Sequence, residues 1–391
     1  MILYNKQGLE NLRIQEETAS VYDAGMISEL ELKQIKQAYP SGFYQPNLII
    51  RSGLFILTCL GIGFSGSLIT LIFEPTHLIE HAAWPLFLGI CCYAILEFFV
   101  KTGRHFHSGI DDALLWCAAA LLAGGLIWGL SDQPQSNLFI SACVLLLSGW
   151  FSLRFANTLM SSIAGLSALA LVFFAWNHAG AIGEATMPFV IMICSYLIYL
   201  QADRISTDPG ARYYQKCLRF LEVTMLSTLY AAGNYFVVQK LSNMLHKLPA
   251  ETNDPIPFGW IFWCWTILLP LLYVALGIRR KNMLLFRLGL ILTAAAAYTF
   301  RVYHHILPVE YVLVIAGGLI LILIIGIIKY LKTPKLGFTY AQRSRKHWVN
   351  NLNLESLVVA GMASHTQSVP VETKDRFGGG SFGGGGASAE F

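Results

Sequence analysis

Toward one end of the long apolar stretches, we single out five charged residues: Glu97, Asp111, Asp112, Glu222 and Arg287. A charge in the hydrocarbon of a bilayer is costly unless it is paired or hydrated, and such residues often mark ion paths or proton relays. We therefore treat these residues as a candidate intramembrane polar cluster. The chemistry that they could support is ion or proton transfer.

Two of the five have a possible partner on their own helix. Glu97 precedes Lys101 by four residues, and Glu222 follows Arg219 by three residues. Residues at these spacings are neighbours on a helix surface and can form ion pairs. For both carboxylates we favour an ion pair near the membrane surface over a transport site.

The other three residues have different explanations. Asp111 and Asp112 open an apolar stretch, where the macrodipole of a helix stabilises carboxylates. Arg287 lies more than a turn inside its stretch and has no acidic residue nearby in sequence. It must either pair with Glu222, Asp111 or Asp112 on another helix or extend to the membrane surface, and the sequence leaves both alternatives open.

A candidate outer cluster lies at the opposite ends of the apolar stretches and comprises Tyr298, Arg301, His304, His305 and Glu310. Histidines in these outer loops could form a metal-linked or proton-linked entry site; the alternative is hydrogen bonding at the membrane surface. Residues 77–81 match the H-x-x-E-H pattern of zinc peptidases. They lie in a short loop near Pro75 without an evident third ligand. We predict no metal site, no cofactor and no catalytic residue, so the expected protein is not an enzyme.

The stretches that position these residues are predicted to be transmembrane helices. Apolar residues make up 55% of the chain and charged residues only 13%, against about 25% charged in soluble domains. A helix of about 20 apolar residues crosses the roughly 30 Å of bilayer hydrocarbon. Small residues such as Gly61, Gly63 and Gly66 are expected at helix contacts. We predict an all-α polytopic membrane protein with about ten spans, at residues 50–73, 82–101, 110–131, 136–155, 157–176, 184–202, 217–239, 258–278, 282–302 and 309–331.

Basic residues gather in alternate loops between these spans, at Lys101, Arg154, Arg204, Arg279 and Lys329 and their neighbours. Loops rich in lysine and arginine remain on the cytoplasmic side. With an even number of spans, both termini are therefore predicted to be cytoplasmic. The segment from Asp203 to Arg219 combines basic and aromatic residues, and we expect it to contact anionic membrane lipids. The basic residues follow the topology, so no nucleic-acid partner is indicated.

Residues 1–48 are polar and predict a cytosolic helical hairpin ahead of a transmembrane domain at residues 49–331. Ser28 precedes Glu31 by three residues, which is the spacing of a helix capping box. We expect the two helices of the hairpin to join near Gly25. All eight cysteines lie in or beside apolar stretches, where cysteine behaves as a small buried side chain.

The last segment, residues 332–391, turns polar and ends in the glycine-rich sequence DRFGGGSFGGGGASAEF. Glycine-rich composition predicts a flexible tail. Phe377, Phe382 and Phe391 interrupt it, and each ring would be unfavourable in water. We predict that these three phenylalanines anchor the tail to a protein partner.

Four segments carry a resemblance to known proteins: DAGMISELE, GIRRKNMLLFRLGL from Gly277, YTFRVY from Tyr298 and AGGLILIL from Ala316. With them the chain resembles bacterial predicted-membrane-protein families of unknown function, and its tail is similar to the Gly/Phe/Ser-rich tails of some bacterial membrane-anchored proteins. This resemblance implies the bacterial inner membrane and no particular activity. From the residues we favour a non-enzymatic accessory or assembly subunit; the alternative is a secondary transporter of a small solute or ion, built from two inverted halves.

Overall fold

The computed structural model describes residues 2–23, 25–73, 81–103, 105–245 and 258–303, together with the single positions 249, 325 and 329. Within these residues every regular element is helical, apart from one isolated bridge between Tyr44 and His105. The chain divides into a unit of residues 1–345 and a second unit of residues 346–391. The second unit lies outside the described residues, so the helices below all belong to the first unit.

The N-terminal hairpin consists of α1 (Lys6–Asp23) and α2 (Glu29–Ala38), with Gly25 in the turn at φ +73°. The predicted capping box is confirmed: the Ser28 hydroxyl accepts a hydrogen bond from the Glu31 N–H, and the Glu31 carboxylate accepts one from the Ser28 N–H at 2.7 Å. The hydrogen bonds from Ser28, that of its backbone first, lower the pKa of the Glu31 carboxyl. The hairpin is therefore locally well defined by its own side chains.

Eight helices of the described residues are long and apolar enough to cross a membrane. They are α3 (Leu48–Phe73), α4 (Ala83–Gly103), α5 (Ile110–Leu130), α6 (Ser136–Phe155), α7 (Thr158–Asn177), α8 (Ala181–Ser206), α11 (Gly259–Arg279) and α12 (Met283–Tyr303). Each begins and ends within a few residues of a predicted span. The predicted multi-pass, all-helical membrane fold is confirmed to this extent, while the predicted span at 309–331 lies outside the described residues except for positions 325 and 329.

The predicted span at residues 217–239 is wrong as a continuous helix. The chain forms α9 (Gln215–Gly233) and then α10 (Tyr235–Leu245), separated by Asn234 in an extended conformation. The Asn234 side-chain oxygen accepts hydrogen bonds from the N–H groups of Phe236 and Val237 at 3.0 and 3.3 Å. It thereby caps the start of α10 and compensates for the interrupted helix. In addition, α9 carries three charged residues in its first half, namely Lys216, Arg219 and Glu222.

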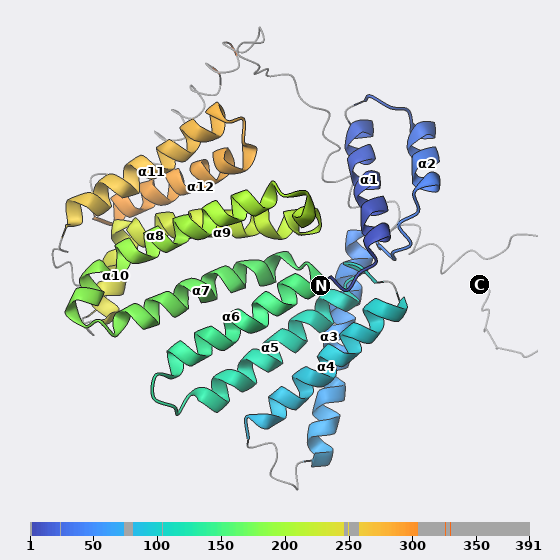
Figure 1. Cartoon of the computed structure of the whole chain (residues 1–391), viewed down its shortest axis with the longest axis horizontal. Coiled ribbons are helices and arrows are strands. Elements are labelled where there is room, and N and C mark those ends of the chain that lie inside the picture. Colours follow the sequence, from blue (N-terminus) through green and yellow to red (C-terminus); the bar gives the residue numbers. More distant parts are fainter. Residues whose placement is uncertain are drawn as a thin grey trace, which may run out of the picture. The chain divides into compact units, whose positions relative to one another are not determined.

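Consecutive helices pack in pairs, α4 with α5, α6 with α7, α8 with α9, and α11 with α12. The pairs follow one another in a row because α3 packs on α5, α5 on α6, α7 on α9, and α9 on both α11 and α12 (Figure 1). A short 3-10 helix, η3 (Pro209–Tyr214), joins α8 to α9. The short connections predicted from the sequence therefore do produce neighbouring helices.

Two separate clusters of buried side chains form the core. The first joins α4, α5 and α6 and includes Leu96, Leu114, Phe151 and Phe155. The second joins α8, α9, α11 and α12 and includes Leu226, Leu269, Tyr273 and Leu288. Each half of the row thus has an apolar centre of its own.

Glycines have different roles in α5 and in α3. At Gly125 of α5 an added Cβ would clash with Leu86 of α4, so glycine permits the close approach of these two helices. At Gly61, Gly63 and Gly66 of α3, by contrast, no described atom lies within 4 Å of the position that a Cβ would occupy. The predicted packing role is therefore wrong for the α3 glycines among the described residues, because α3 touches its neighbours elsewhere.

Candidate functional site

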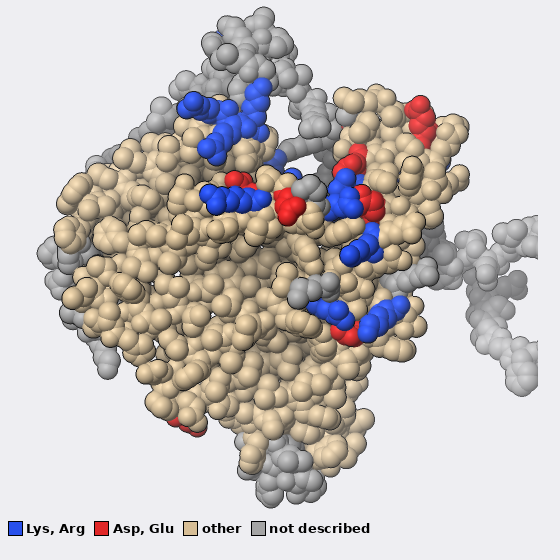
Figure 2. Space-filling view, viewed as in Figure 1, with Lys and Arg blue, Asp and Glu red and all other residues tan. Residues whose placement is uncertain are grey.

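Charged side chains gather where α4, α6, α8 and α11 end and where α3, α5, α7, α9 and α12 begin. We call this region the charged end; its basic residues include Lys101, Arg154, Arg204, Lys216 and Arg279. Figure 2 shows Lys, Arg, Asp and Glu concentrated along this margin, whereas the broad surface over the middle of the helices is uncharged on the face drawn. The alternation of basic loops in the sequence therefore corresponds to a single end of the helices.

Asp111 lies in the first turn of α5 and hydrogen-bonds to the loop that precedes this helix at the charged end. Gly109 in this loop has φ +98°, and a side chain there would clash with the backbone oxygen of Arg51, so glycine lets α3 lie against the loop. Asp111 is only 3% exposed. Its carboxylate accepts hydrogen bonds from the N–H groups of His107 at 2.7 Å and Ser108 at 2.8 Å. Backbone donors therefore satisfy this buried charge.

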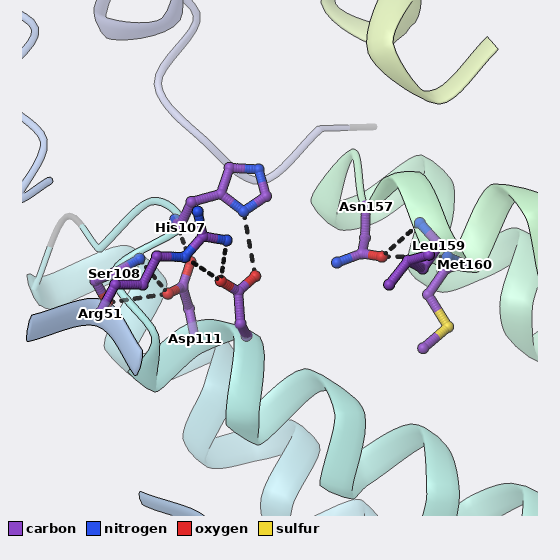
Figure 3. Close-up of polar contacts among 8 residues, drawn as sticks. Arg51, His107, Ser108, Asp111, Asn157, Leu159 and Met160 are labelled. Carbon is purple, nitrogen blue, oxygen red and sulfur yellow. Dashed lines mark hydrogen bonds and ion pairs between the residues drawn. The ribbon is translucent and has the colours of Figure 1, made fainter. Parts of the chain in front are cut away.

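Asp112, the next residue, binds two side chains from outside its helix. Its Oδ2 accepts hydrogen bonds from Arg51 Nη2 at 2.6 Å and Arg51 Nε at 3.2 Å, and its Oδ1 lies 3.1 Å from His107 Nδ1. Figure 3 shows the arginine and the histidine converging on the start of α5. Neither partner was predicted, although the topology placed Arg51 at the same end as Asp112. A search for cations at that end could have found it.

The N-terminal segment packs directly beside these carboxylates. Tyr4 is buried, and its ring meets those of Phe106 and Phe43 edge-on at centroid distances of 4.8 and 6.2 Å. Burial raises the pKa of the Tyr4 hydroxyl well above its usual value, and the negative charges of Asp111 and Asp112 raise it further. Tyr4 is therefore neutral at physiological pH and couples the start of the chain to the start of α5.

Glu97 forms a second ion-pair group between α4 and α6. Its carboxylate lies 3.1 Å from Lys101 Nζ, as the spacing predicted, and also 2.9 Å from Arg154 Nη2. The Tyr93 hydroxyl donates to it at 2.9 Å and accepts a hydrogen bond from Trp150 Nε1 at 3.1 Å. The group is partly exposed, with 22% of the Glu97 side chain and 25% of the Arg154 side chain accessible. The group therefore connects α4 to α6. This arrangement suits a contact between helices better than a path for ions.

Glu222 and Arg287 do not join these groups. Among the described residues, no ion pair within 4.0 Å links Glu222 to Arg219 or links Arg287 to a carboxylate. Arg287 is exposed on α12, whose buried face carries Leu285, Leu288 and Leu292 against α9 and α11. Of the two alternatives left open for Arg287, pairing with Glu222, Asp111 or Asp112 is thus absent from the described part of the chain, because the arginine lies on the other face of its helix.

The predicted outer residues are only partly described. Tyr298 is 60% exposed and contacts Phe236 edge-on at 6.0 Å, and Arg301 is partly buried. His304, His305 and Glu310 lie outside the described residues, as do positions 77–80 of the H-x-x-E-H segment. The predicted tail anchors Phe377, Phe382 and Phe391 also lie outside them. These predictions therefore remain predictions.

A buried neutral group at the junction of α9 and α10 was missed by the sequence reasoning. Asn234 Nδ2 donates to the Tyr230 hydroxyl at 2.9 Å and to Thr299 Oγ1 of α12 at 3.1 Å. The adjacent Tyr235 N–H donates to Thr266 Oγ1 of α11 at 3.0 Å. An asparagine within an otherwise apolar stretch is the signal that could have indicated a polar contact between helices.

Two of the cavities among the described residues lie beside α3 and α5. The α3 cavity, of about 1260 Å³, lies between α3, α4 and α5. Its described lining residues are apolar residues, glycine, cysteine, serine and threonine, and none of these is charged. The charged-end cavity, of about 390 Å³, is lined by residues that include Arg51, His107, Asp112 and Asn157. Only the second cavity therefore adjoins the ion pairs.

The described arrangement can hold charges in fixed positions, because arginine, lysine, histidine or backbone N–H groups bind the carboxylates of Glu97, Asp111 and Asp112. Among the described residues, no group of three His, Cys, Asp or Glu side chains is placed to hold a metal ion.

Comparisons of the chain with protein-family models, with curated proteins and with solved structures found no match.

Proposed function

We propose that the protein is a non-enzymatic accessory or assembly subunit of the bacterial inner membrane that presents its N-terminal hairpin to a protein partner. In this proposal both termini and the charged end are cytoplasmic, as the distribution of basic residues favours. One observation supports it most strongly. Helix α1 is fixed to the helix bundle, whereas α2 buries none of its residues.

Several contacts fix α1. The Leu3 N–H donates to the Arg154 carbonyl oxygen at 3.0 Å, just ahead of the helix. Leu12 is 6% exposed within α1. Lys216 Nζ of α9 lies 2.9 Å from the Glu16 carboxylate, an exposed pair that adds orientation more than stability. The chain is therefore fixed to α6 just ahead of α1, and an exposed ion pair with α9 orients the helix.

Helix α2, in contrast, is directed outward. Leu30 is 66% exposed, and Met26 in the preceding turn is 76% exposed. Single exposed apolar residues are common on protein surfaces, but α2 as a whole contributes no buried residue to the described core. Because the capping box and α1 already order it, little conformational entropy would be lost when a partner binds. These features favour a preformed docking helix.

The ion pairs fit the same proposal. Glu97 and Asp112 are each bound by an arginine from another helix, which suits a structural role in orienting helices. The alternative function, a secondary transporter, is favoured by the α3 cavity, which is large enough for a small solute. Among the described residues its lining offers hydroxyl, thiol and apolar groups and no charged side chain, so we favour the accessory role.

The proposal also assigns the glycine-rich tail a second contact with the same partner, through Phe377, Phe382 and Phe391. Burial of one phenylalanine is worth about 1.5–3 kcal/mol. Three rings would therefore compensate for the ordering of a short glycine-rich segment with little excess. Binding through the tail is expected to be moderate and sensitive to each ring.

The test uses the full chain purified from membranes in mild detergent. Leu30→Asp and Met26→Asp alter only exposed side chains, so the free energy of unfolding should not change while a stoichiometric partner is lost in native mass spectrometry. Gln133→Asp, which adds the same charge at an exposed position ahead of α6, is the matched control and should retain the partner. Deletion of residues 377–391 tests the tail in the same way. Identical composition for the wild type and all variants would contradict the proposal.

A further inference from the structure

The charged-end cavity has features that the proposed docking role does not use. It lies where α3, α5 and α7 begin, and its polar lining comprises Arg51, Ser52, His107, Asp112, Asn157 and Thr158. The apolar residues Leu48 and Ile56, which are 50% and 59% exposed, lie beside it on α3. The cavity therefore joins a polar interior to an apolar outer surface.

Asn157 provides an unused donor in this cavity. The residue is 6% exposed, and its Oδ1 accepts hydrogen bonds from the Leu159 and Met160 N–H groups at 3.1 Å each. These bonds fix the orientation of the amide, so Nδ2 must point away from α7. Nδ2 has no acceptor among the described residues, and Figure 3 shows the amide directed across the cavity towards Arg51 and His107. The Asn157 side chain is therefore buried while its Nδ2 faces the cavity, where this donor is available to a ligand.

Arg51 provides a second donor. Its Nε and Nη2 both bind Asp112 Oδ2, while its Nη1 has no acceptor among the described residues. The charge of Asp112 is balanced by Arg51, and its other oxygen lies against His107 Nδ1. Asp112 therefore positions the arginine and the histidine, and its carboxylate is not available to a cationic ligand.

Helix α7 adds a favourable potential for negative charge. It has 20 residues and directs its N-terminal end at this cavity, and its first turn carries no acidic residue, whereas the first turn of α5 carries Asp111 and Asp112. Helix N-termini stabilise anions, phosphate above all. The hydroxyl groups of Ser52 and Thr158 can donate further hydrogen bonds.

We propose that the charged-end cavity binds a phosphate group, carried either by an anionic phospholipid or by soluble phosphate. A phosphate offers several acceptor oxygens to a lining in which the available groups are mainly donors. Asn157 and Arg51 contact the phosphate from opposite sides, and the exposed apolar residues of α3 offer a surface for an acyl chain if the phosphate belongs to a lipid. This site is independent of the proposed docking helix α2.

The decisive variant is Asn157→Asp. It retains the side-chain oxygen that caps α7 but replaces the free donor with a negatively charged acceptor, so phosphate binding should weaken by at least about tenfold. Asn282→Asp is the matched control, because Asn282 caps α12 in the same way, accepting from the Leu284 and Leu285 N–H groups at 3.0 and 3.3 Å. This control should bind like the wild type.

The measurement is the thermal unfolding midpoint of the full chain in two arms. One compares inorganic phosphate with chloride at equal ionic strength in detergent; the other compares nanodiscs of phosphatidylcholine with and without phosphatidylglycerol. The wild type and Asn282→Asp should be stabilised in at least one arm, and that arm identifies the source of the phosphate group. No stabilisation in either arm, or equal stabilisation of Asn157→Asp, would overturn the proposal. If Asn157→Asp does not fold, Arg51→Gln must lose the same response, and an unchanged response would overturn it equally.

Discussion

Charged groups connect helices α3 to α6 to one another, whereas neutral amides and hydroxyls connect α9 to α12. In the first region Arg154 binds Glu97 at the charged end, and both side chains remain more than one-fifth exposed, at 25% and 22%. In the second region Asn234 and Thr299 are each 3% exposed and hydrogen-bond to each other. Full burial of an ion pair carries a large desolvation cost, while a neutral pair carries less. The difference indicates that charges are used only where water remains within reach.

Asp111 is the exception that tests this interpretation, because it is charged and only 3% exposed. Its partners are N–H and O–H groups of a loop rather than a cation. Several short hydrogen bonds to one carboxylate can replace hydration. Asp111 should therefore matter more to stability than either ion pair.

The largest effect is expected for Asp111→Ala. The substitution leaves the His107 and Ser108 N–H groups without an acceptor, at a cost of about 3–5 kcal/mol in the free energy of unfolding. Asp111→Asn retains one acceptor oxygen and should cost about 1–3 kcal/mol. Equilibrium unfolding in detergent measures both. Equal losses for the two variants would show that the hydrogen bonds to the loop are not the source of stability.

A smaller effect is expected for the partly exposed ion pair. Arg154→Met leaves Glu97 with Lys101 and Tyr93 only, which should cost about 1.5–3 kcal/mol. In the double variant Glu97→Gln/Arg154→Met the remaining charge is also removed, so part of the loss should be recovered. The same unfolding measurement on the wild type, the single variants Glu97→Gln and Arg154→Met, and the double variant gives the coupling energy. Strictly additive losses would mean that the two side chains do not interact.

The neutral region should respond less than the charged one. Asn234→Ala removes the cap of α10 and the hydrogen bond to Thr299, together about 1–2 kcal/mol. Thr299→Val removes only the hydrogen bond between helices and should cost about 0.6 kcal/mol. A loss for Asn234→Ala larger than that for Asp111→Ala would reverse the proposed order of charged and neutral groups.

The helices that cross the membrane were largely predictable, because a long apolar stretch specifies a span almost by length alone. The break at Asn234 was not predictable in the same way. Residues 217–239 remain mostly apolar throughout, and the break is stabilised by Thr299, 65 positions further along the chain. Composition reports the length of an apolar stretch, whereas a break depends on a partner from another helix.

Among the polar contacts, too, those within one helix were predictable from the sequence and those between helices were not. The pair of Glu97 with Lys101 follows from their spacing on one helix. The topology placed Arg51 and Arg154 at the same end as the carboxylates, but choosing them as the partners requires knowledge of which helices are neighbours. His107 lies only five residues before Asp112 and was overlooked. Asn157 was hidden for another reason: its sequence position indicates only a helix cap, and its free Nδ2 becomes visible only in the cavity.

The smallest effect is expected for Arg287, in contrast to Arg51. Both arginines lie near the start of a membrane helix at the charged end, yet Arg51 binds Asp112 whereas Arg287 is exposed without an ion pair among the described residues. Arg287→Leu should therefore change the free energy of unfolding by no more than about 0.5 kcal/mol. Arg51→Leu leaves Asp112 with His107 alone and should cost about 1.5–3 kcal/mol. A loss of about 3–5 kcal/mol for Arg287→Leu would instead reveal a buried carboxylate partner, and α9 to α12 would then also depend on a charged pair.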